Sequence, residues 1–326
     1  MRHLVKQALP WILSLGFVAW LLATTDLEQV GDALERADLG RLMTVLVIAT
    51  AVVYVLDSAT LVLLYRRLTA PVRVRDMFAI KGVSYFFNTV NYGLAAGSIA
   101  LFVHKRYPEV GFVRALSAMM WMSFVDVLVL TIVLAVGWLV GSGLLPDEQV
   151  AVLPYVLATV ACIAVGAFVY WHLGVDFWLL GRLRHLAVFD AFRAARLSDY
   201  GTIMGARLAM MGVYIVTAYF LMGSFDIVIG FIPLLVYMPL LTFMQIVPAQ
   251  ISGLGAIQEL MILLLTPFVA ASVIDPRAEV FAYSLAAGPM MALVRLLIGY
   301  AFIRGVARDF RVSRQAINEA QAGSES

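Results

Sequence analysis

The sequence predicts an all-α, polytopic membrane protein of about seven transmembrane helices plus two re-entrant helical hairpins. Of its 326 residues, 63% are hydrophobic and 13% are charged, and the mean hydropathy is +0.93. A soluble protein of this composition would need a core with almost no polar surface around it. We expect one membrane-embedded domain over residues 1–311 and a polar, disordered cytoplasmic tail over residues 312–326.

The first two predicted spans enclose an acidic loop. Basic residues precede the apolar run 9–23, and no small-x-small cleavage site follows it, so we expect a retained helix rather than a signal peptide. The loop after it is rich in Asp and Glu and is expected to face outward. The second run, 42–64, leads into four arginines between Arg66 and Arg75. They predict a return to the cytoplasm, because basic residues concentrate in cytoplasmic loops.

The first re-entrant hairpin is predicted between these arginines and the next basic cluster, His104 to Arg106. Both flanks are expected to be cytoplasmic. A full crossing takes about 20 apolar residues, so residues 76–103 are too few to cross comfortably twice. Their middle, Asn88 to Ser98, is polar and contains glycine. We therefore expect a hairpin that enters from the cytoplasm and returns to it.

The central part of the chain predicts three further spans. Residues 112–140 and 150–171 are joined by a loop of Gly, Pro and acidic residues that is expected to lie outside. The next segment contains five basic residues and is expected to be cytoplasmic. Its apolar residues, from Phe177 to Leu197, recur at roughly helical spacing, which predicts an amphipathic helix on the membrane surface. Residues 200–222 then cross outward.

The second re-entrant hairpin is predicted over residues 227–273, where two apolar runs flank a break with Pro248 and a Gly-Leu-Gly sequence. Hydrocarbon does not hydrate free backbone groups, so such a break needs protein or a wet cavity around it. The tip, residues 245–259, contains no Lys or Arg and is expected to stay in the membrane. Residues 281–303 form the last predicted span, which places both termini in the cytoplasm.

Two hairpins that enter from opposite sides are typical of inverted-repeat transporters, whose broken helices meet near the membrane midplane. If the two breaks meet here, they would line one polar pocket. The candidate substrate-binding residues are Asn88, Asn91, Gly93, Asp126, Arg207, Pro248, Ser252, Gly253, Gly255, Glu259 and Arg295. The glycines would let backbone N–H groups approach a phosphate closely, and the two asparagines would either donate to it or cap the broken helix.

Ionisable residues within the predicted spans need a partner or a wet cavity, because each costs about 2.5 to 3.5 kcal/mol to insert. They are Asp57, Lys81, Asp126, Arg207, Glu259 and Arg295. Asp126 fits a structural ion pair as well as a functional role. Glu259 would begin a half-helix, whose free N–H groups suit an anionic phosphate. The two arginines would neutralise these carboxylates or hold a lipid phosphate, although Arg207 is close enough to a helix end to snorkel to the interface.

The stretch from Pro248 to Glu259 also carries a resemblance to a known family. Its order of Pro, a small polar residue, Gly-Leu-Gly and a later Glu resembles the signature Pro-x-Ser-x-Gly-Gly-Leu-Gly-x-x-Glu of the lysylphosphatidylglycerol synthase transmembrane-region family, also called flippase-like membrane proteins. Ser252 stands where the first paired glycine is usual, and Gln258 where an Arg often precedes the Glu. A weaker similarity covers Asn88 to Asp126. The resemblance implies lipid transport between leaflets.

The expected function is translocation of a phosphate-bearing lipid across the cell inner membrane, without an ATPase in the chain. A phospholipid, an aminoacylated phospholipid and a polyprenyl-phosphate carrier all fit. No metal-ligand spacing, nucleotide-binding glycine loop or long hydrophilic segment for a soluble synthase domain is present in the sequence, so we expect no enzyme activity, no cofactor and no metal. The alternative is a membrane-embedded lipid-modifying enzyme or an accessory subunit of a lipid synthase. Membrane lipids are the expected partners, a lipid-synthesising enzyme or a second copy of the chain are further candidates, and nucleic acid is not expected.

Overall fold

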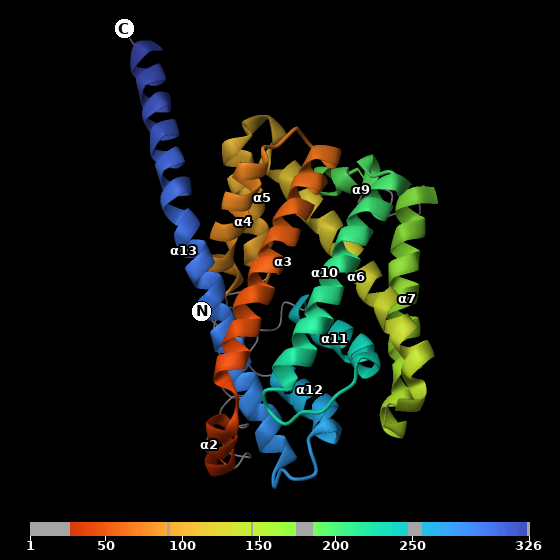
Figure 1. The fold of residues 1–326 in the computed structure, drawn as a ribbon. Coiled ribbons are helices and arrows are strands. Elements are labelled where there is room, and N and C mark those ends of the chain that lie inside the picture. The colour runs from red at the N-terminus through yellow and green to blue at the C-terminus, as the bar shows by residue number, and fades with distance from the viewer. Residues whose placement is uncertain (1–26, 90–91, 145, 174–184, 247–255, 325–326) are drawn as a thin grey trace, which may run out of the picture.

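The computed structural model describes residues 27–89, 92–144, 146–173, 185–246 and 256–324. Within these ranges every named element is a helix, and the only β-type pairing is an isolated bridge between Ile227 and Val269. Figure 1 shows long helices standing side by side, with shorter helices packed between them. The predicted all-α, polytopic membrane fold is confirmed.

Five helices of the described ranges are long and apolar enough to cross a membrane. They are α3 (Leu39–Leu68), α6 (Phe112–Gly141), α7 (Asp147–Leu173), α10 (Leu197–Met222) and α13 (Pro276–Ser324). The shortest apolar stretch among them has 21 residues. At about 1.5 Å per residue it is about 31 Å long, which matches a hydrocarbon core of about 30 Å. The predicted span over residues 9–23 lies outside the described residues.

The first predicted hairpin consists of α4 (Val74–Asn88) and α5 (Tyr92–Arg106), which pack against each other. Each has 15 residues and is about 22 Å long, so neither crosses the hydrocarbon core alone. Hydrogen bonds join the feet of the hairpin, since Asp76 accepts from the Tyr107 hydroxyl at 2.6 Å and from Arg106 Nε at 3.1 Å. A 3₁₀ turn, η1 (Pro108–Val110), then leads into α6.

The second predicted hairpin consists of α11 (Phe231–Ile246) and α12 (Ala256–Leu265), followed by η4 (Thr266–Phe268). It enters the bundle from the end opposite to the first hairpin (Figure 1). Its feet are joined by backbone hydrogen bonds from Val228 to the Phe268 carbonyl at 2.8 Å and from Ala270 to the Asp226 carbonyl at 2.9 Å. The tip, residues 247–255, lies outside the described residues.

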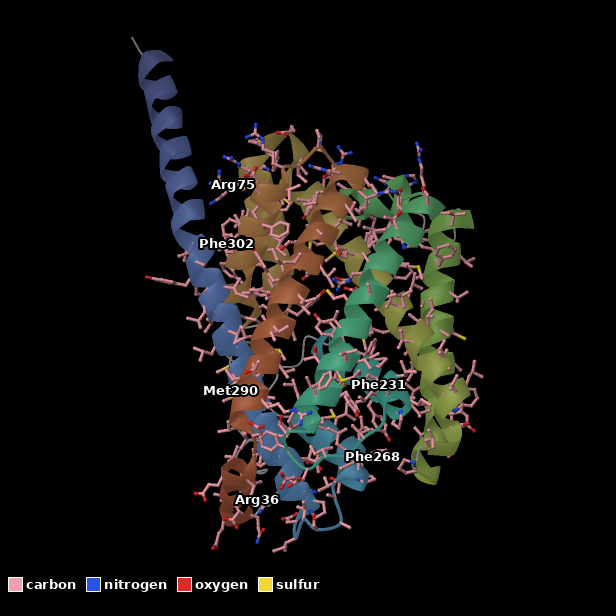
Figure 2. The ribbon with its side chains drawn as sticks, viewed as in Figure 1. Arg36, Arg75, Phe231, Phe268, Met290 and Phe302 are labelled. Carbon is pink, nitrogen blue, oxygen red and sulfur yellow. The ribbon has the colours of Figure 1, made fainter. Side chains whose placement is uncertain are left out.

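Glycines allow both hairpins to pack closely against long helices. A Cβ on Gly137 of α6 would lie 2.8 Å from the Leu235 backbone of α11, and one on Gly141 would lie 2.7 Å from the Ile232 side chain. Small residues four apart permit this approach in membrane helices. A Cβ on Gly82 of α4 would likewise lie 2.6 Å from the ring of Phe302 on α13; Figure 2 shows this phenylalanine on the side of α13 that faces the hairpin.

The bundle has two ends, which we name after two arginines labelled in Figure 2. The Arg75 end carries the α3–α4 and α5–α6 connections and the start of α10. The Arg36 end carries α2 (Leu27–Arg36), the α6–α7 connection with η2 (Ser142–Leu144), and the feet of the second hairpin. There Arg36 forms an ion pair of 2.9 Å with Glu279, whose side chain is 1% exposed.

Residues 185–197, the described part of the predicted surface helix over residues 177–197, do not form one continuous helix. The chain forms a 3₁₀ turn, η3 (Ala187–Phe189), and a short helix, α9 (Asp190–Ala194), before α10 begins. It folds back onto the bundle because the rings of Phe189 and Phe192 pack on Trp171 at centroid distances of 4.8 and 5.0 Å. The backbone N–H of Ala191 also donates to Ser117 Oγ of α6 at 2.9 Å.

The C-terminal segment also differs from expectation in its backbone. Helix α13 continues to Ser324, whereas composition predicts a disordered tail over residues 312–326. This segment contains Ala, Gln, Glu and Arg and no proline, and these residues have high helix propensity. A helix that begins in the membrane therefore meets no proline or glycine in this segment before Gly323, next to its end.

Candidate functional site

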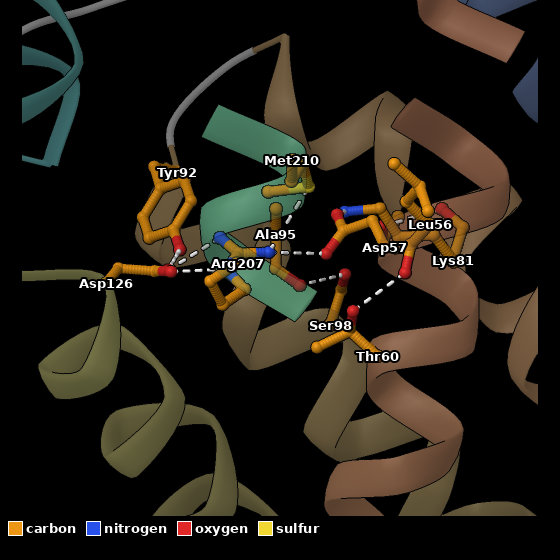
Figure 3. A network of polar contacts seen from close by, with 11 residues as sticks. Leu56, Asp57, Thr60, Lys81, Tyr92, Ala95, Ser98, Asp126, Arg207 and Met210 are labelled. Atoms are coloured by element: carbon orange, nitrogen blue, oxygen red, sulfur yellow. Dashed lines mark hydrogen bonds and ion pairs between the residues drawn. The ribbon is translucent and has the colours of Figure 1, made fainter. Parts of the chain in front are cut away.

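A network of charged side chains lies inside the bundle, centred on Arg207 of α10 (Figure 3). Its Nη2 donates to Asp126 Oδ2 of α6 at 2.7 Å, and its Nε donates to the other oxygen of the same carboxylate. Its Nη1 donates to Asp57 Oδ1 of α3 at 2.8 Å. The ammonium group of Lys81, on α4, forms an ion pair with Asp57 Oδ2. The network thus ties the first hairpin to three long helices.

All of these groups lie far from the helix ends. Along their helices, Arg207 is about 15 Å from Leu197, Asp57 about 16 Å from Leu68 and Asp126 about 21 Å from Phe112. The exposed fraction is 7% for each aspartate and 9% for Arg207. The network therefore lies within the membrane-spanning part of the bundle.

The network is electrically balanced. Lys81 and Arg207 contribute two positive charges, and Asp57 and Asp126 contribute two negative charges. An unpaired charge at this depth would cost about 2.5 to 3.5 kcal/mol, and the two parallel bonds from Arg207 to Asp126 are a strong form of pairing. Arg207 therefore does not snorkel to the interface: its guanidinium is directed into the bundle and paired there.

The tip of the first hairpin contacts this network. The hydroxyl of Tyr92, the first residue of α5, lies 3.5 Å from Asp126 Oδ2, as Figure 3 shows. Of the predicted site residues at this tip, Asn88 ends α4 and is partly buried, and Gly93 lies in the first turn of α5. Asn91 lies outside the described residues. The structure thus places this predicted tip beside Asp126 and Arg207.

The second tip is described only from α12 onward. Glu259, in the first turn of α12, accepts from Arg277 Nη2 at 3.0 and 3.3 Å. We expected Arg295 and Arg207 to neutralise Asp126 and Glu259 or to hold a lipid phosphate. Arg207 does pair with Asp126, but neither arginine pairs with Glu259. Arg207 is paired with the two aspartates, and Arg277, at the start of α13, reaches Glu259 instead. The other predicted residues of this tip, Pro248, Ser252, Gly253 and Gly255, lie outside the described residues.

The two hairpins approach each other inside the bundle, because α11 of the second contacts α5 of the first. Both also pack on α6, which carries Asp126. The tip of the first hairpin and the body of the second therefore share one long helix. The meeting of the two breaks themselves stays a prediction, because residues 247–255 lie outside the described ranges.

Arg295, the remaining predicted site residue, lies on α13 opposite α4. It is partly buried, and its Cζ lies 5.9 Å from the centre of the Tyr85 ring. On the same ring, Lys81 Nζ lies 5.2 Å from the centre. Cations above an aromatic face are attracted by its electrons. No carboxylate of the described residues lies within ion-pair distance of Arg295.

Sequence reasoning noted Asp57 and Lys81 as ionisable residues of the membrane but did not choose them as site residues. It missed Tyr85 and Tyr92 altogether. Tyrosine is common in membrane helices, so no sequence signal separates these two from the others. Among the parts of the chain that the structure describes, no group of three or more His, Cys, Asp or Glu residues could hold a metal ion.

Comparison with known proteins identifies the family of the chain. No curated protein and no solved structure matches it. The family model of the Lysylphosphatidylglycerol synthase TM region matches residues 7–305, a range that includes both hairpins and all five long apolar stretches. The family is thus the one suggested by the Pro248 to Glu259 stretch. The chain belongs to the Lysylphosphatidylglycerol synthase TM region family.

Proposed function

We propose that this protein moves a phosphate-bearing lipid between the two leaflets of the inner membrane and has no enzymatic activity. The observation that carries the proposal is the pair of helical hairpins, which enter the bundle from opposite ends, the first ending at a buried charge network. Broken helices of this kind form substrate sites in many transporters. Membership in a family of membrane proteins named for lipid synthesis supports a lipid-related role.

The network offers chemistry suited to a phosphate head group. Guanidinium groups bind carboxylates and phosphates in the same two-pronged geometry. A phosphate oxygen arriving at Arg207 would replace a carboxylate oxygen of Asp126, and the displaced Asp126 carboxylate would take up a proton or pair with the cationic group of an aminoacylated lipid, which keeps the network balanced. Lys81 belongs to the first hairpin and Asp57 to α3, so a similar exchange at Lys81 would release the hairpin from a long helix. Head-group binding and hairpin movement are coupled in this scheme.

The charges at the two ends favour one orientation. The Arg75 end carries the basic residues Arg66, Arg67, Arg73, Arg75, Lys105, Arg106, Arg114, Arg193 and Arg196. The Arg36 end carries the acidic residues Glu28, Asp32, Glu35, Asp38, Asp226, Asp275 and Glu279. Because cytoplasmic loops are rich in Lys and Arg, we place the Arg75 end, and with it the end of α13, in the cytoplasm. The basic residues Arg2, His3 and Lys6 lead us to propose the same side for the N-terminus.

The test is leaflet exchange in liposomes that contain the purified protein. Fluorescent phosphatidylglycerol, lysyl-phosphatidylglycerol and polyprenyl phosphate are each placed in both leaflets, and an impermeant reductant bleaches the outer one. The protein should increase the fraction bleached over time, with or without a proton or sodium gradient. Arg207→Lys keeps the charge but loses the two-pronged geometry, so it should slow exchange at least about tenfold. Arg114→Ala, an exposed site at the Arg75 end, is the control and should exchange like the wild type.

Two results would refute the proposal. The first is an unchanged exchange rate for all three lipids under every gradient, with monodisperse protein in the liposomes. The second is chemical change of an added lipid, detected by mass spectrometry, in the absence of exchange. That outcome would favour the competing function, a membrane-embedded lipid-modifying enzyme or its accessory subunit.

A further inference from the structure

We propose that Arg295 and Tyr85 form a binding site for one phosphodiester group of a lipid, between α4 and α13. The site adjoins the balanced network around Arg207, because Lys81 Nζ lies 5.2 Å from the centre of the same Tyr85 ring. That the anion belongs to a lipid rests on the proposed function, whereas the site itself rests on the charges and the hydroxyl described below.

The first argument is the charge balance of the membrane-embedded residues. Among the described residues in the middle of these helices, Lys81, Arg207 and Arg295 are cations, and Asp57 and Asp126 are carboxylates. Three positive charges against two negative charges leave one positive charge in excess. The four paired residues neutralise one another, so the excess lies at Arg295. A partly buried cation at this depth is stabilised by one negative charge that the described chain does not supply.

The second argument is the Tyr85 hydroxyl. Tyr85 is 3% exposed, and its hydroxyl has no hydrogen-bond partner among the described residues. Leaving such a group unpaired is unfavourable, because the hydroxyl has lost its hydrogen bonds to water and gained none in return. Arg295 Cζ lies 5.9 Å from the centre of the Tyr85 ring, so an O–H donor and a guanidinium are available to one ligand. Both groups are satisfied together if that ligand is an anion with oxygen acceptors.

The third argument is access from the lipid. Beside Arg295 on α13, Leu293 and Leu297 are 50% and 62% exposed. Nearby, Gly299 brings the same helix close to α4, since a Cβ there would lie 3.1 Å from the Gly82 carbonyl oxygen. A head group at Arg295 can thus sit beside the α4–α13 crossing while its acyl chains remain along the exposed leucines.

The excess of one charge selects the class of anion. A phosphodiester carries one negative charge and has two free oxygens that fit the guanidinium fork. A phosphate monoester carries about 1.5 to 2 negative charges at pH 7, so it would replace an excess positive charge with an excess negative one. The site therefore favours a phospholipid or an aminoacylated phospholipid over a polyprenyl monophosphate. A fatty-acid carboxylate has the right charge, but it lacks the two ester oxygens that give a phosphodiester further acceptors for the Tyr85 hydroxyl.

The experiment measures binding without transport. The full chain, delipidated in detergent, is titrated with phosphatidylglycerol, polyprenyl monophosphate or oleate, and native mass spectrometry counts the bound lipids. The wild type should bind one phosphatidylglycerol most tightly. Tyr85→Phe removes only the hydroxyl and should weaken binding about 3- to 10-fold, the effect of one hydrogen bond. Arg295→Ala should weaken binding at least about tenfold. Arg295→Lys should bind phosphatidylglycerol with an affinity between those of the wild type and Arg295→Ala.

Matched controls separate binding from folding. Tyr155→Phe, on the exposed face of α7, and Arg114→Ala should bind phosphatidylglycerol like the wild type. Without lipid, Tyr85→Phe should unfold at the same temperature as the wild type or a higher one, because the lost hydroxyl was unpaired. If Tyr85→Phe and Arg295→Ala both bind phosphatidylglycerol as tightly as the wild type, the site is wrong. Equal or tighter binding of monophosphate or oleate would overturn the phosphodiester assignment.

The two proposals fail in different ways. If Arg295→Ala abolishes binding but the wild type does not exchange lipids between leaflets, the site stands and translocation is refuted. If the wild type exchanges lipids while Arg295→Ala and Tyr85→Phe bind and exchange equally well, translocation stands and the site is refuted.

Discussion

Removing one member of the Arg207–Asp126 pair should destabilise the bundle far more than removing both. In Asp126→Leu, Arg207 keeps its 2.8 Å bond to Asp57 Oδ1 and its weaker 3.5 Å contact with Met210 Sδ, and it loses both bonds to the former carboxylate. The buried network then carries one excess positive charge. Breaking a buried ion pair from one side typically costs about 3 to 5 kcal/mol. Arg207→Met should cost a similar amount, because it leaves Asp126 without its only guanidinium.

The double variant Asp126→Leu/Arg207→Met restores the balance. Asp57 and Lys81 remain as a one-to-one pair, and two side chains of similar length fill the space of the lost ion pair. Such replacements are often neutral or stabilising. The double variant should therefore be more stable than either single variant, with a coupling free energy of at least about 3 kcal/mol. The sign of this coupling free energy follows from the charge count of the network alone.

The assay is reversible unfolding of the purified protein in mixed micelles, followed by circular dichroism as the fraction of denaturing detergent increases. The wild type, the two single variants and the double variant form one double-mutant cycle. Gly143→Leu/Thr159→Met, at sites on the α6–α7 side away from the network, controls for general effects of added apolar volume. The reasoning is refuted if the losses of the two single variants simply add in the double variant.

Two further predictions concern the hairpins. Gly137→Val should destabilise the protein by about 1 to 3 kcal/mol through overpacking against α11. Gly143→Val is the control and should not destabilise it, because a Cβ there would meet nothing within 4 Å. Equal unfolding midpoints for the two variants would contradict the close α6–α11 contact. At the feet of the first hairpin, outside the five membrane-spanning helices, burial raises the pKa of Asp76, but hydrogen bonds from Tyr107 and Arg106 outweigh it, so the pKa lies below its ordinary value. Because the pKa is lowered on folding, the ionised Asp76 stabilises the protein above about pH 4, and this stability is lost as the pH falls through the folded-state pKa. Asp76→Asn should therefore be less stable than the wild type at pH 7. In the same unfolding assay, the difference should shrink below pH 4.

The sequence alone determined the position and kind of most elements, because apolar length can be compared directly with the thickness of a bilayer. The runs 42–64, 112–140, 150–171, 200–222 and 281–303 each predicted a long helix that the structure contains. The short distance between two basic clusters predicted the first hairpin, and α4 and α5 have the lengths that this argument requires. The surface segment after α7 differed because aromatic packing on Trp171, which no periodicity records, folded it back.

The sequence also marked which residues would be costly in the membrane, since the cost of burying a charge does not depend on knowing its neighbours. Only the tertiary structure decided their partners. Arg207 is 81 positions from Asp126 and 150 from Asp57, and Glu259 pairs with Arg277 rather than with the deeper arginine we expected. Hydrophobic periodicity defines the buried face of a helix but not the helix that covers it. Ion pairing acts over a few ångströms in space, so the balance around Arg207 and the excess charge at Arg295 arise only when α3, α4, α6, α10 and α13 pack together.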